Sequence, residues 1–154
     1  MISMRARCAT ASAPGGRETE ALNVDAPRNR LTPYTGVDAA EIHRIAKAVE
    51  RWGQRFLDRV YTPAEQHYCG LRVQRLAGRF AAKEAISKVL GTGIRYIRWR
   101  EMEILPDAKG KPVVTLYGRA QSVAASLKLG AIGVSITHTG DLALAFAMAL
   151  GDNG

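Results

Sequence analysis

The sequence has few of the features that mark an exported or membrane-bound protein. Its two cysteines, Cys8 and Cys69, have neither the spacing of a metal site nor that of a disulfide framework, which favours a reducing compartment. No apolar run approaches the roughly 18 residues of a membrane span. The N-terminal residues lack the continuous apolar segment of a secretory signal. These absences predict a cytoplasmic location and no association with a membrane.

Sequence signatures of several common binding and catalytic sites are also missing. There is no helix-turn-helix, zinc-finger or aromatic RNA-binding signature. The glycines of Gly91-Thr92-Gly93 lack the third glycine and the preceding strand of a dinucleotide-binding fingerprint. No Ser-His-Asp arrangement is visible, which argues against hydrolase chemistry. The motifs therefore predict no nucleic-acid partner.

Acidic residues are scarce relative to basic ones. The 154 residues include 22 Lys and Arg against 14 Asp and Glu, a net charge of +8. Such a charge favours polyanionic partners, namely nucleic acid, anionic lipid, a nucleotide-like cofactor or an acidic protein. On charge alone, a basic module that binds nucleic acid or an acidic protein without catalysis is an alternative to an enzyme.

The hydrophobic pattern begins after the first 30 residues. Residues 1–30 show no periodicity and are predicted to be a disordered extension. Residues 31–150 are expected to form one domain. Its apolar spacing predicts strands at 31–37, 95–105, 111–117, 132–137 and 142–150, and helices at 41–57, 63–68, 73–90 and 119–129. This order predicts an α+β fold, a single domain of antiparallel strands packed against long helices.

The helix predicted at 41–57 carries two stripes. Its apolar stripe contains Ile42, Ile45, Val49, Trp52 and Phe56, and its basic stripe contains Arg44, Lys47, Arg51 and Arg55. A basic stripe of this kind is either a solvated surface or a docking surface for an acidic protein. The spacing leaves both interpretations open.

The helix predicted at 73–90 places an acid and a base on one face. Phe80, Glu84 and Lys88 follow one another at intervals of four residues. A carboxylate beside a lysine suits a magnesium-bound phosphate ester, because the acid binds the hard cation and the ammonium binds phosphate oxygens. An ordinary pair on the helix surface is the alternative. Upstream, Asp38 could cap a helix with Glu41 at the third position, or serve as a second metal-binding acid.

The sequence motifs around these residues resemble those of a known family. Residues 80–88, Phe-Ala-Ala-Lys-Glu-Ala-Ile-Ser-Lys, resemble the second signature of the 4′-phosphopantetheinyl transferases, in particular the short bacterial holo-[acyl-carrier-protein] synthases. The first signature, Gly-x-Asp followed closely by Glu, is similar to residues 36–41. Further matching words occur in the family's order at 62–65, 76–79, 91–94, 110–112 and 134–139.

The resemblance implies a phosphopantetheinyl transferase fold and a Mg²⁺-dependent reaction. The 4′-phosphopantetheine arm of coenzyme A would move to a serine of apo acyl carrier protein, releasing adenosine 3′,5′-bisphosphate, as part of fatty-acid biosynthesis. By this resemblance, Asp38 and Glu84 bind the metal and are catalytic together with Lys88. Pro33 and the two alanines after Asp38 depart from the family's usual pattern. A degenerate member that binds coenzyme A without transferring its arm is therefore a second alternative.

The resemblance also assigns residues to the two substrates. Coenzyme A is expected at Lys88, Gly93, His138 and Thr139. The apo acyl carrier protein is expected at Arg44 and Arg51 of the basic stripe. Short synthases of this type form homotrimers with active sites between neighbouring subunits, so the resemblance implies a homotrimer here.

Overall fold

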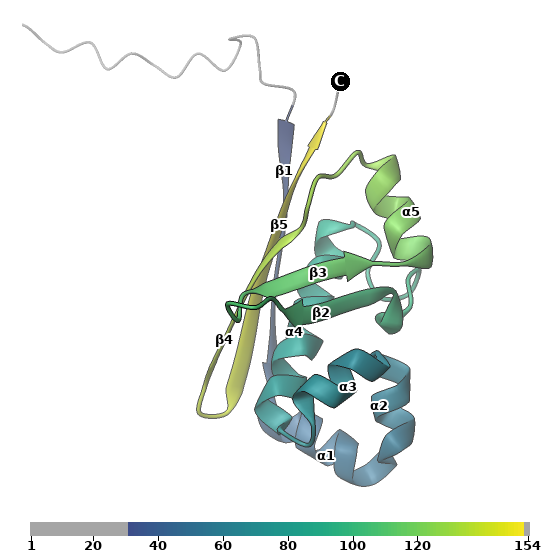
Figure 1. The fold of residues 1–154 in the computed structure, drawn as a ribbon. Helices are drawn as coiled ribbons and strands as arrows, with labels where there is room; N and C mark the ends of the chain where they lie inside the picture. The colour runs from purple at the N-terminus through teal and green to yellow at the C-terminus, as the bar shows by residue number, and fades with distance from the viewer. Residues whose placement is uncertain (1–30, 153–154) are drawn as a thin grey trace, which may run out of the picture.

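The computed structural model describes residues 31–152. The predicted disordered extension at 1–30 lies outside the described residues. The elements follow the order β1 (Leu31–Glu41), α1 (Ile42–Trp52), α2 (Gln54–Val60), α3 (Pro63–Cys69), α4 (Val73–Val89), the 3₁₀ turn η1 (Trp99–Glu101), β2 (Met102–Pro106), β3 (Pro112–Leu116), α5 (Gly118–Ser126), β4 (Gly133–Thr139) and β5 (Leu142–Asp152). The predicted α+β fold of antiparallel strands and helices is confirmed (Figure 1).

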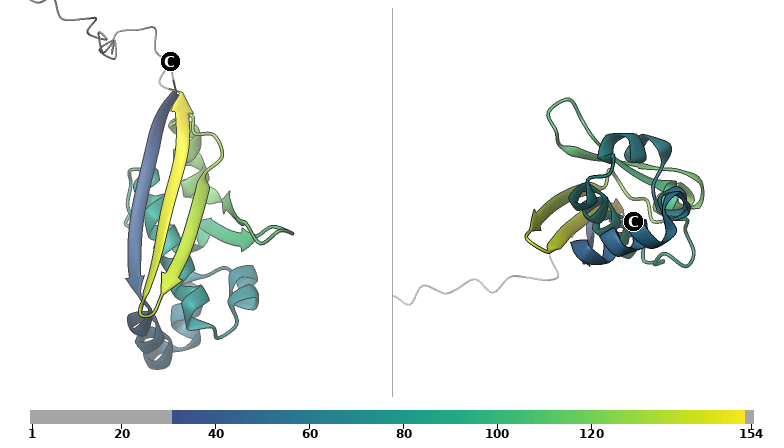
Figure 2. Two further views of the ribbon diagram at one scale, coloured as in Figure 1. Left: turned by 90° about the vertical axis from the view of Figure 1, so that its left-hand side faces the viewer. Right: turned by 90° about the horizontal axis from the view of Figure 1, so that it is seen from below.

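Three long strands form the main sheet. β1, β5 and β4 pair antiparallel in that order, side by side, with the helices behind them (Figure 2, left). Alternate residues of β5 point to opposite faces. The inward residues are the buried alanines Ala143, Ala145, Ala147 and Ala149. Small side chains on this face let the longest helix, α4, pack closely against the sheet.

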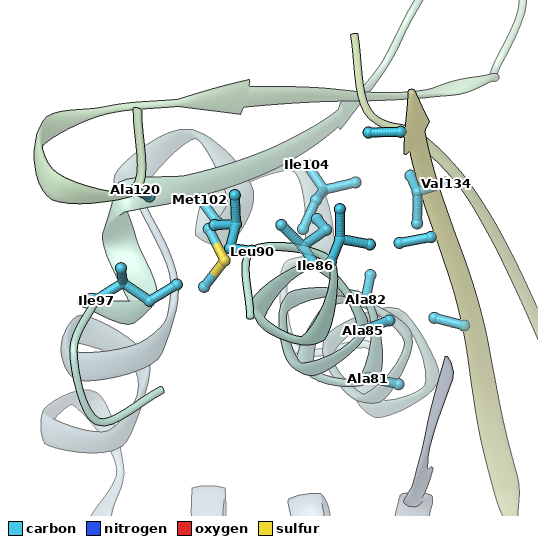
Figure 3. Close-up of a cluster of buried hydrophobic side chains, with 14 of the residues drawn as sticks. Ala81, Ala82, Ala85, Ile86, Leu90, Ile97, Met102, Ile104, Ala120 and Val134 are labelled. Atoms are coloured by element: carbon cyan, nitrogen blue, oxygen red, sulfur yellow. The ribbon is translucent and has the colours of Figure 1, made fainter. Parts of the chain in front are cut away.

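Helix α4 is largely buried, and small residues on its own surface let neighbouring elements pack closely against it. Ala81, Ala82 and Ala85 are fully buried, and Ile86 points from the helix into the core beside β2 and β4 (Figure 3). On the sheet side, a Cβ atom on Gly36 of β1 would clash with the backbone carbonyl of Ala85. A glycine at position 36 therefore sets how closely β1 approaches α4.

The segment predicted as one helix at 41–57 is two helices. Gly53 adopts a φ of +49°, a left-handed conformation that favours glycine and ends α1 after Trp52. The break also changes which residues of the predicted apolar stripe are buried. Ile45 is buried as predicted, but the Trp52 side chain is 52% exposed because it stands on the last residue of α1, where the chain turns away.

The strand predicted at 95–105 begins only at Met102. Before it, side chains satisfy the backbone groups that a partner strand would otherwise take. The Glu101 carboxylate accepts the Arg98 N–H at 3.1 Å, and the Trp99 carbonyl accepts a hydrogen bond from Lys83 at 3.0 Å. The predicted hairpin that follows is confirmed as β2 and β3. Within residues 31–152, no helix combines the length and apolar character needed to cross a bilayer.

Candidate active site

Asp38 lies within β1, on the face of the sheet that α4 covers. The strand continues past it to Glu41, which occupies the position before helix α1. The interpretation of Asp38 as a helix cap is therefore wrong, because extended pairing with β5 carries the strand four residues beyond its predicted end at position 37. Its partner in the register is Ala145, whose small side chain leaves room beside the carboxylate.

Lys88 joins the last turn of α4 to β1. Its Nζ donates a 2.8 Å hydrogen bond to Asp38 Oδ1 and a 2.6 Å hydrogen bond to the Val37 carbonyl. The Lys88 and Asp38 side chains are 49% and 24% exposed, so the ion pair borders solvent. A ligand can therefore reach both groups.

Glu84 lies one helical turn before Lys88 and faces the same cluster. Partial burial raises the pKa of the Glu84 carboxyl, and the nearby negative charge of Asp38 raises it further, while Lys88 lowers it. Asp38 is thus near enough for its charge to act on Glu84, and Lys88, one turn further along α4, bonds Asp38 directly. The structure thus brings together the three residues predicted to be catalytic, Asp38, Glu84 and Lys88.

The donor set suits magnesium. Between residues 31 and 152, no three or more His, Cys, Asp or Glu side chains form a group that could hold a metal. Zinc sites in proteins usually take three or four such ligands. Magnesium keeps most of its waters and takes only one or two carboxylates. Asp38 and Glu84 offer that number of carboxylates, and a Mg²⁺ site at this pair stays a prediction.

His138 and Thr139 lie at the other edge of the sheet. Asp38 pairs with Ala145 on one side of β5, whereas His138 pairs with Ala143 on the other. Two strand spacings of about 4.8 Å each separate these edges. A single chain therefore brings Asp38, Glu84 and Lys88 together without His138 and Thr139. The expected contacts of His138 and Thr139 with coenzyme A stay a prediction.

Gly93 follows the end of α4 on the Lys88 side. Gly91 ends the helix with a φ of +68°, as the sequence predicts, and its N–H donates to the Lys88 carbonyl at 3.0 Å. The Gly93 N–H donates to the Ser87 carbonyl at 3.3 Å. This turn stays close to Lys88, as a cofactor-binding role for Gly93 requires.

Arg44 and Arg51 line one surface hollow of about 670 Å³. Aromatic side chains of Trp52, Phe56 and Phe80 line the same hollow, and the Arg51 guanidinium lies 5.2 Å from the centre of the Trp52 ring. Ala40, on the same face of β1 as Asp38, also belongs to the lining, and Phe80 of the lining precedes Glu84 by one turn of α4. The basic stripe therefore borders a concave, partly aromatic surface. This surface lies near Asp38 and Glu84, called here the acidic cluster. Sequence reasoning missed the exposed Trp52.

Sequence reasoning also missed a buried ion pair. Lys83 Nζ lies 2.6 Å from Glu65 Oε2, and both side chains are fully buried. The ammonium also donates to the carbonyls of Val60 and Trp99, and Glu65 Oε1 accepts the Ile104 N–H at 3.0 Å. The signal was the position of Lys83, since it falls in the apolar stripe of α4. The pair ties α4, which carries Glu84, to α2, α3, η1 and β2.

Comparisons with known proteins identify the family of this chain. A sequence profile of the 4′-phosphopantetheinyl transferase superfamily matches residues 34–147. The chain is 48% identical over 124 residues to the holo-[acyl-carrier-protein] synthase of Herpetosiphon aurantiacus, covering 76% of this chain and 98% of that one. It is 42% identical over 116 residues to the synthase of Halothermothrix orenii, covering 73% and 93%.

Solved structures give the same result. The holo-[acyl-carrier-protein] synthase of Helicobacter pylori in complex with coenzyme A matches with a TM-score of 0.69 and 31% identity, over 75% of this chain and 98% of that one. The synthase of Neisseria meningitidis matches with a TM-score of 0.68 and 38% identity, over 75% and 95%. The chain therefore belongs to the 4′-phosphopantetheinyl transferase superfamily and, within it, to the holo-[acyl-carrier-protein] synthases.

Proposed function

We propose that this protein transfers the 4′-phosphopantetheine arm of coenzyme A to a serine of apo acyl carrier protein and releases adenosine 3′,5′-bisphosphate. The observation that carries the proposal is the convergence of Asp38 with Glu84 and Lys88. These residues come from two separate family signatures, and Lys88 bonds Asp38 across fifty positions of sequence. Membership of the synthases supports the choice of both substrates. It also disfavours a basic nucleic-acid-binding module.

Asp38 and Glu84 are the proposed metal ligands, and Lys88 is the proposed phosphate ligand. Mg²⁺ bound at the two carboxylates would neutralise charge that grows on the phosphate oxygens. Lys88 reaches the cluster from the end of α4 and would exchange its bond with Asp38 for one with the pyrophosphate. A lysine suits this exchange because its ammonium is a mobile point charge.

The reaction forms one bond to phosphorus and breaks another. The serine oxygen of the carrier attacks the β-phosphorus, the bond from that phosphorus to the bridging oxygen breaks, and the leaving bisphosphate keeps the oxygen. The serine must also lose its proton. One of the two carboxylates, Asp38 or Glu84, would orient the water that accepts that proton.

The two substrates approach this centre from different sides. Coenzyme A is proposed to contact Lys88, Gly93, His138 and Thr139. The acyl carrier protein is proposed to dock on Arg44 and Arg51, whose hollow includes Ala40, on the same face of β1 as Asp38. Docking there would bring a serine of the carrier close to the acidic cluster.

A homotrimer is proposed for two structural reasons. First, the outer face of β5 exposes an apolar row of Leu142, Leu144, Phe146, Met148 and Leu150, each 38–42% exposed. Such a continuous apolar row marks an interaction surface. Second, one chain holds His138 two strands away from Asp38, and a neighbouring chain is proposed to supply the His138 of each site. Cytoplasmic fatty-acid biosynthesis is proposed as the setting.

One assay tests the function. The protein is incubated with coenzyme A, Mg²⁺ and a purified apo acyl carrier protein, and the carrier is weighed by mass spectrometry. We expect the mass of the phosphopantetheine arm to appear on the carrier serine and to vanish when the metal is chelated. A carrier of unchanged mass, with coenzyme A bound to the protein, would instead indicate the degenerate family member.

A further inference from the structure

Three hollows on the helical side of the molecule are joined into one groove. The hollow that holds Arg44 and Arg51 shares its aromatic residues with a second hollow of about 460 Å³, namely Trp52, Phe56 and Phe80. The second hollow shares Arg59 and Trp99 with a third of about 640 Å³. Because neighbouring hollows have lining residues in common, they lie next to one another and form a groove from α1 to η1.

Aromatic rings line the middle of the groove. The rings of Phe80 and Trp99 lie 4.6 Å apart and join α4 to η1. Phe56 contacts the smaller of the two cores, and Trp52 stands exposed at the end of α1. Aromatic side chains are enriched at the centres of protein interfaces. The middle of the groove thus has the composition of a docking surface.

The far end of the groove is strongly basic. Four arginines line the third hollow and are called here the distal arginine cluster: Arg59, Arg95, Arg98 and Arg100. All four are exposed to solvent. An exposed cluster on an open groove suits the acidic side chains of a protein, because charged groups on the two sides of a protein interface are arranged with opposite sign.

Three acids near the distal arginine cluster compensate it only in part. Glu101 Oε2 is occupied by backbone donors, the N–H of Arg98 at 3.1 Å and that of Ala120 at 3.3 Å. Hydrogen bonds from glutamine side chains lower the pKa of Asp58, and the charge of Arg100 lowers it further. Glu103 Oε2 accepts a 2.6 Å hydrogen bond from the hydroxyl of Thr62, which lines the same hollow. Each carboxylate is thus already engaged, and four cations face three acids. The cluster keeps an excess of positive charge.

We propose that the distal arginine cluster is a second docking site for the acidic carrier protein that also contacts Arg44 and Arg51. This inference rests on the proposed function. The charge is complementary to an acidic protein, and the groove connects the two basic ends through an apolar middle. A carrier lying along the groove would keep its serine at the Asp38 end and place a second acidic region against Arg98 and Arg100.

The test compares two charge-matched variants of the full chain. Arg98→Glu/Arg100→Glu reverses two charges in the groove. The control, Lys109→Glu/Lys128→Glu, reverses two exposed charges outside it. We expect the groove variant to raise the carrier KM about five- to tenfold and to weaken its salt dependence, since each rim charge contributes modestly. The KM for coenzyme A and kcat should stay unchanged, and the control should behave like wild type.

Direct binding separates this inference from the proposed function. The dissociation constant of the apo carrier is measured by fluorescence anisotropy without coenzyme A, so turnover is not needed. Wild type that binds the carrier but never modifies it would overturn the proposed function alone. A groove variant that binds the carrier as tightly as the control would overturn the second docking site alone. Loss of all carrier binding in wild type would overturn both.

Two further measurements complete the test. If the reversed variant does not fold, Arg98→Gln/Arg100→Gln removes both charges with similar side-chain length and should give a smaller increase of the same sign. A fluorescent DNA duplex is offered to the same proteins as an alternative polyanion. Duplex binding that is tighter than carrier binding and is lost in the groove variant would assign the cluster to nucleic acid and overturn the proposal.

Discussion

Lys88 donates a 2.8 Å hydrogen bond to Asp38, from the last turn of the longest helix to the middle of the first strand. Both side chains border solvent, and an exposed pair of this kind adds little stability. The pair is important because of where it holds the Lys88 and Asp38 side chains. Gly36 lets β1 approach α4 closely enough for the pair to form, and the pair stands beside Glu84 where two like charges meet.

Removing either acid should abolish the Mg²⁺-dependent reaction. In Asp38→Ala or Glu84→Ala, one of the two proposed metal ligands is lost, and kcat should fall by about 100-fold or more. Both variants should stay folded by circular dichroism, because neither side chain belongs to a hydrophobic core. Turnover is measured by mass spectrometry of the carrier, with Glu50→Ala on the exposed face of α1 as the control. Full activity in both variants would remove the metal proposal.

Glu84 should titrate above an exposed glutamate. Burial and the charge of Asp38 raise its pKa, so at mildly acid pH the folded protein holds a proton that the unfolded chain has released. The associated stabilisation is present below the unfolded pKa and is lost as pH rises through the folded pKa. Mg²⁺ binds the deprotonated form, so its affinity should rise over that window.

Carboxyl NMR of the metal-free protein measures this titration directly. Asp38→Asn removes the neighbouring charge and should lower the pKa of Glu84, whereas burial should keep it above that of an exposed glutamate. The unfolding free energy of Glu84→Gln should lose the wild-type dependence on pH in the same window. An unshifted Glu84 in wild type would contradict the convergence of the two carboxylates.

Reversing the charges of Arg44 and Arg51 should weaken docking of the carrier protein. Arg44→Glu/Arg51→Glu is expected to raise the carrier KM about tenfold and to flatten its dependence on salt, because favourable charge pairs become repulsive. The KM for coenzyme A should change little. Steady-state kinetics at several salt concentrations measure both constants. If the carrier KM is unchanged, the basic stripe is plain surface.

Breaking the buried ion pair should destabilise the fold. Lys83→Met leaves the Glu65 carboxylate buried without its partner and should lower the free energy of unfolding by about 3–5 kcal/mol. The double variant Lys83→Met/Glu65→Gln also removes the negative charge and should recover part of that loss. Denaturant unfolding at a fixed protein concentration gives both values. Equal stability of the single and double variants would show that the stranded charge is not the cause.

The outer face of the sheet should hold the assembly together. Phe146→Asp places a charge in the exposed apolar row and is expected to turn a trimer into monomers in sedimentation analysis. The shared site predicts a complementation experiment. Inactive Asp38→Ala and His138→Ala proteins, mixed and allowed to exchange subunits, should regain part of the activity. No recovery after proven exchange would place both residues in one chain's site.

The pattern of residues was sufficient for most elements. Thr62 and Glu65 predicted a helix start, and their reciprocal capping bonds form as expected. Glycine at 91 predicted the end of α4. These signals are local, because a cap or a positive φ depends on a few neighbouring residues. The strand predicted at 95–105 failed over 95–101, where Lys83, sixteen residues before Trp99, takes the Trp99 carbonyl and Glu101 takes the Arg98 N–H.

From the sequence alone came the family, the α+β class and the candidates Asp38, Glu84 and Lys88, since residue types at fixed spacings carry that information. Only the tertiary structure decided that these three meet, that His138 stands two strands away, and that Lys83 is buried against Glu65. The physical reason is that strand register and helix packing join positions far apart in the chain. The spacing of residues along the chain does not show which side chains lie together in the folded protein.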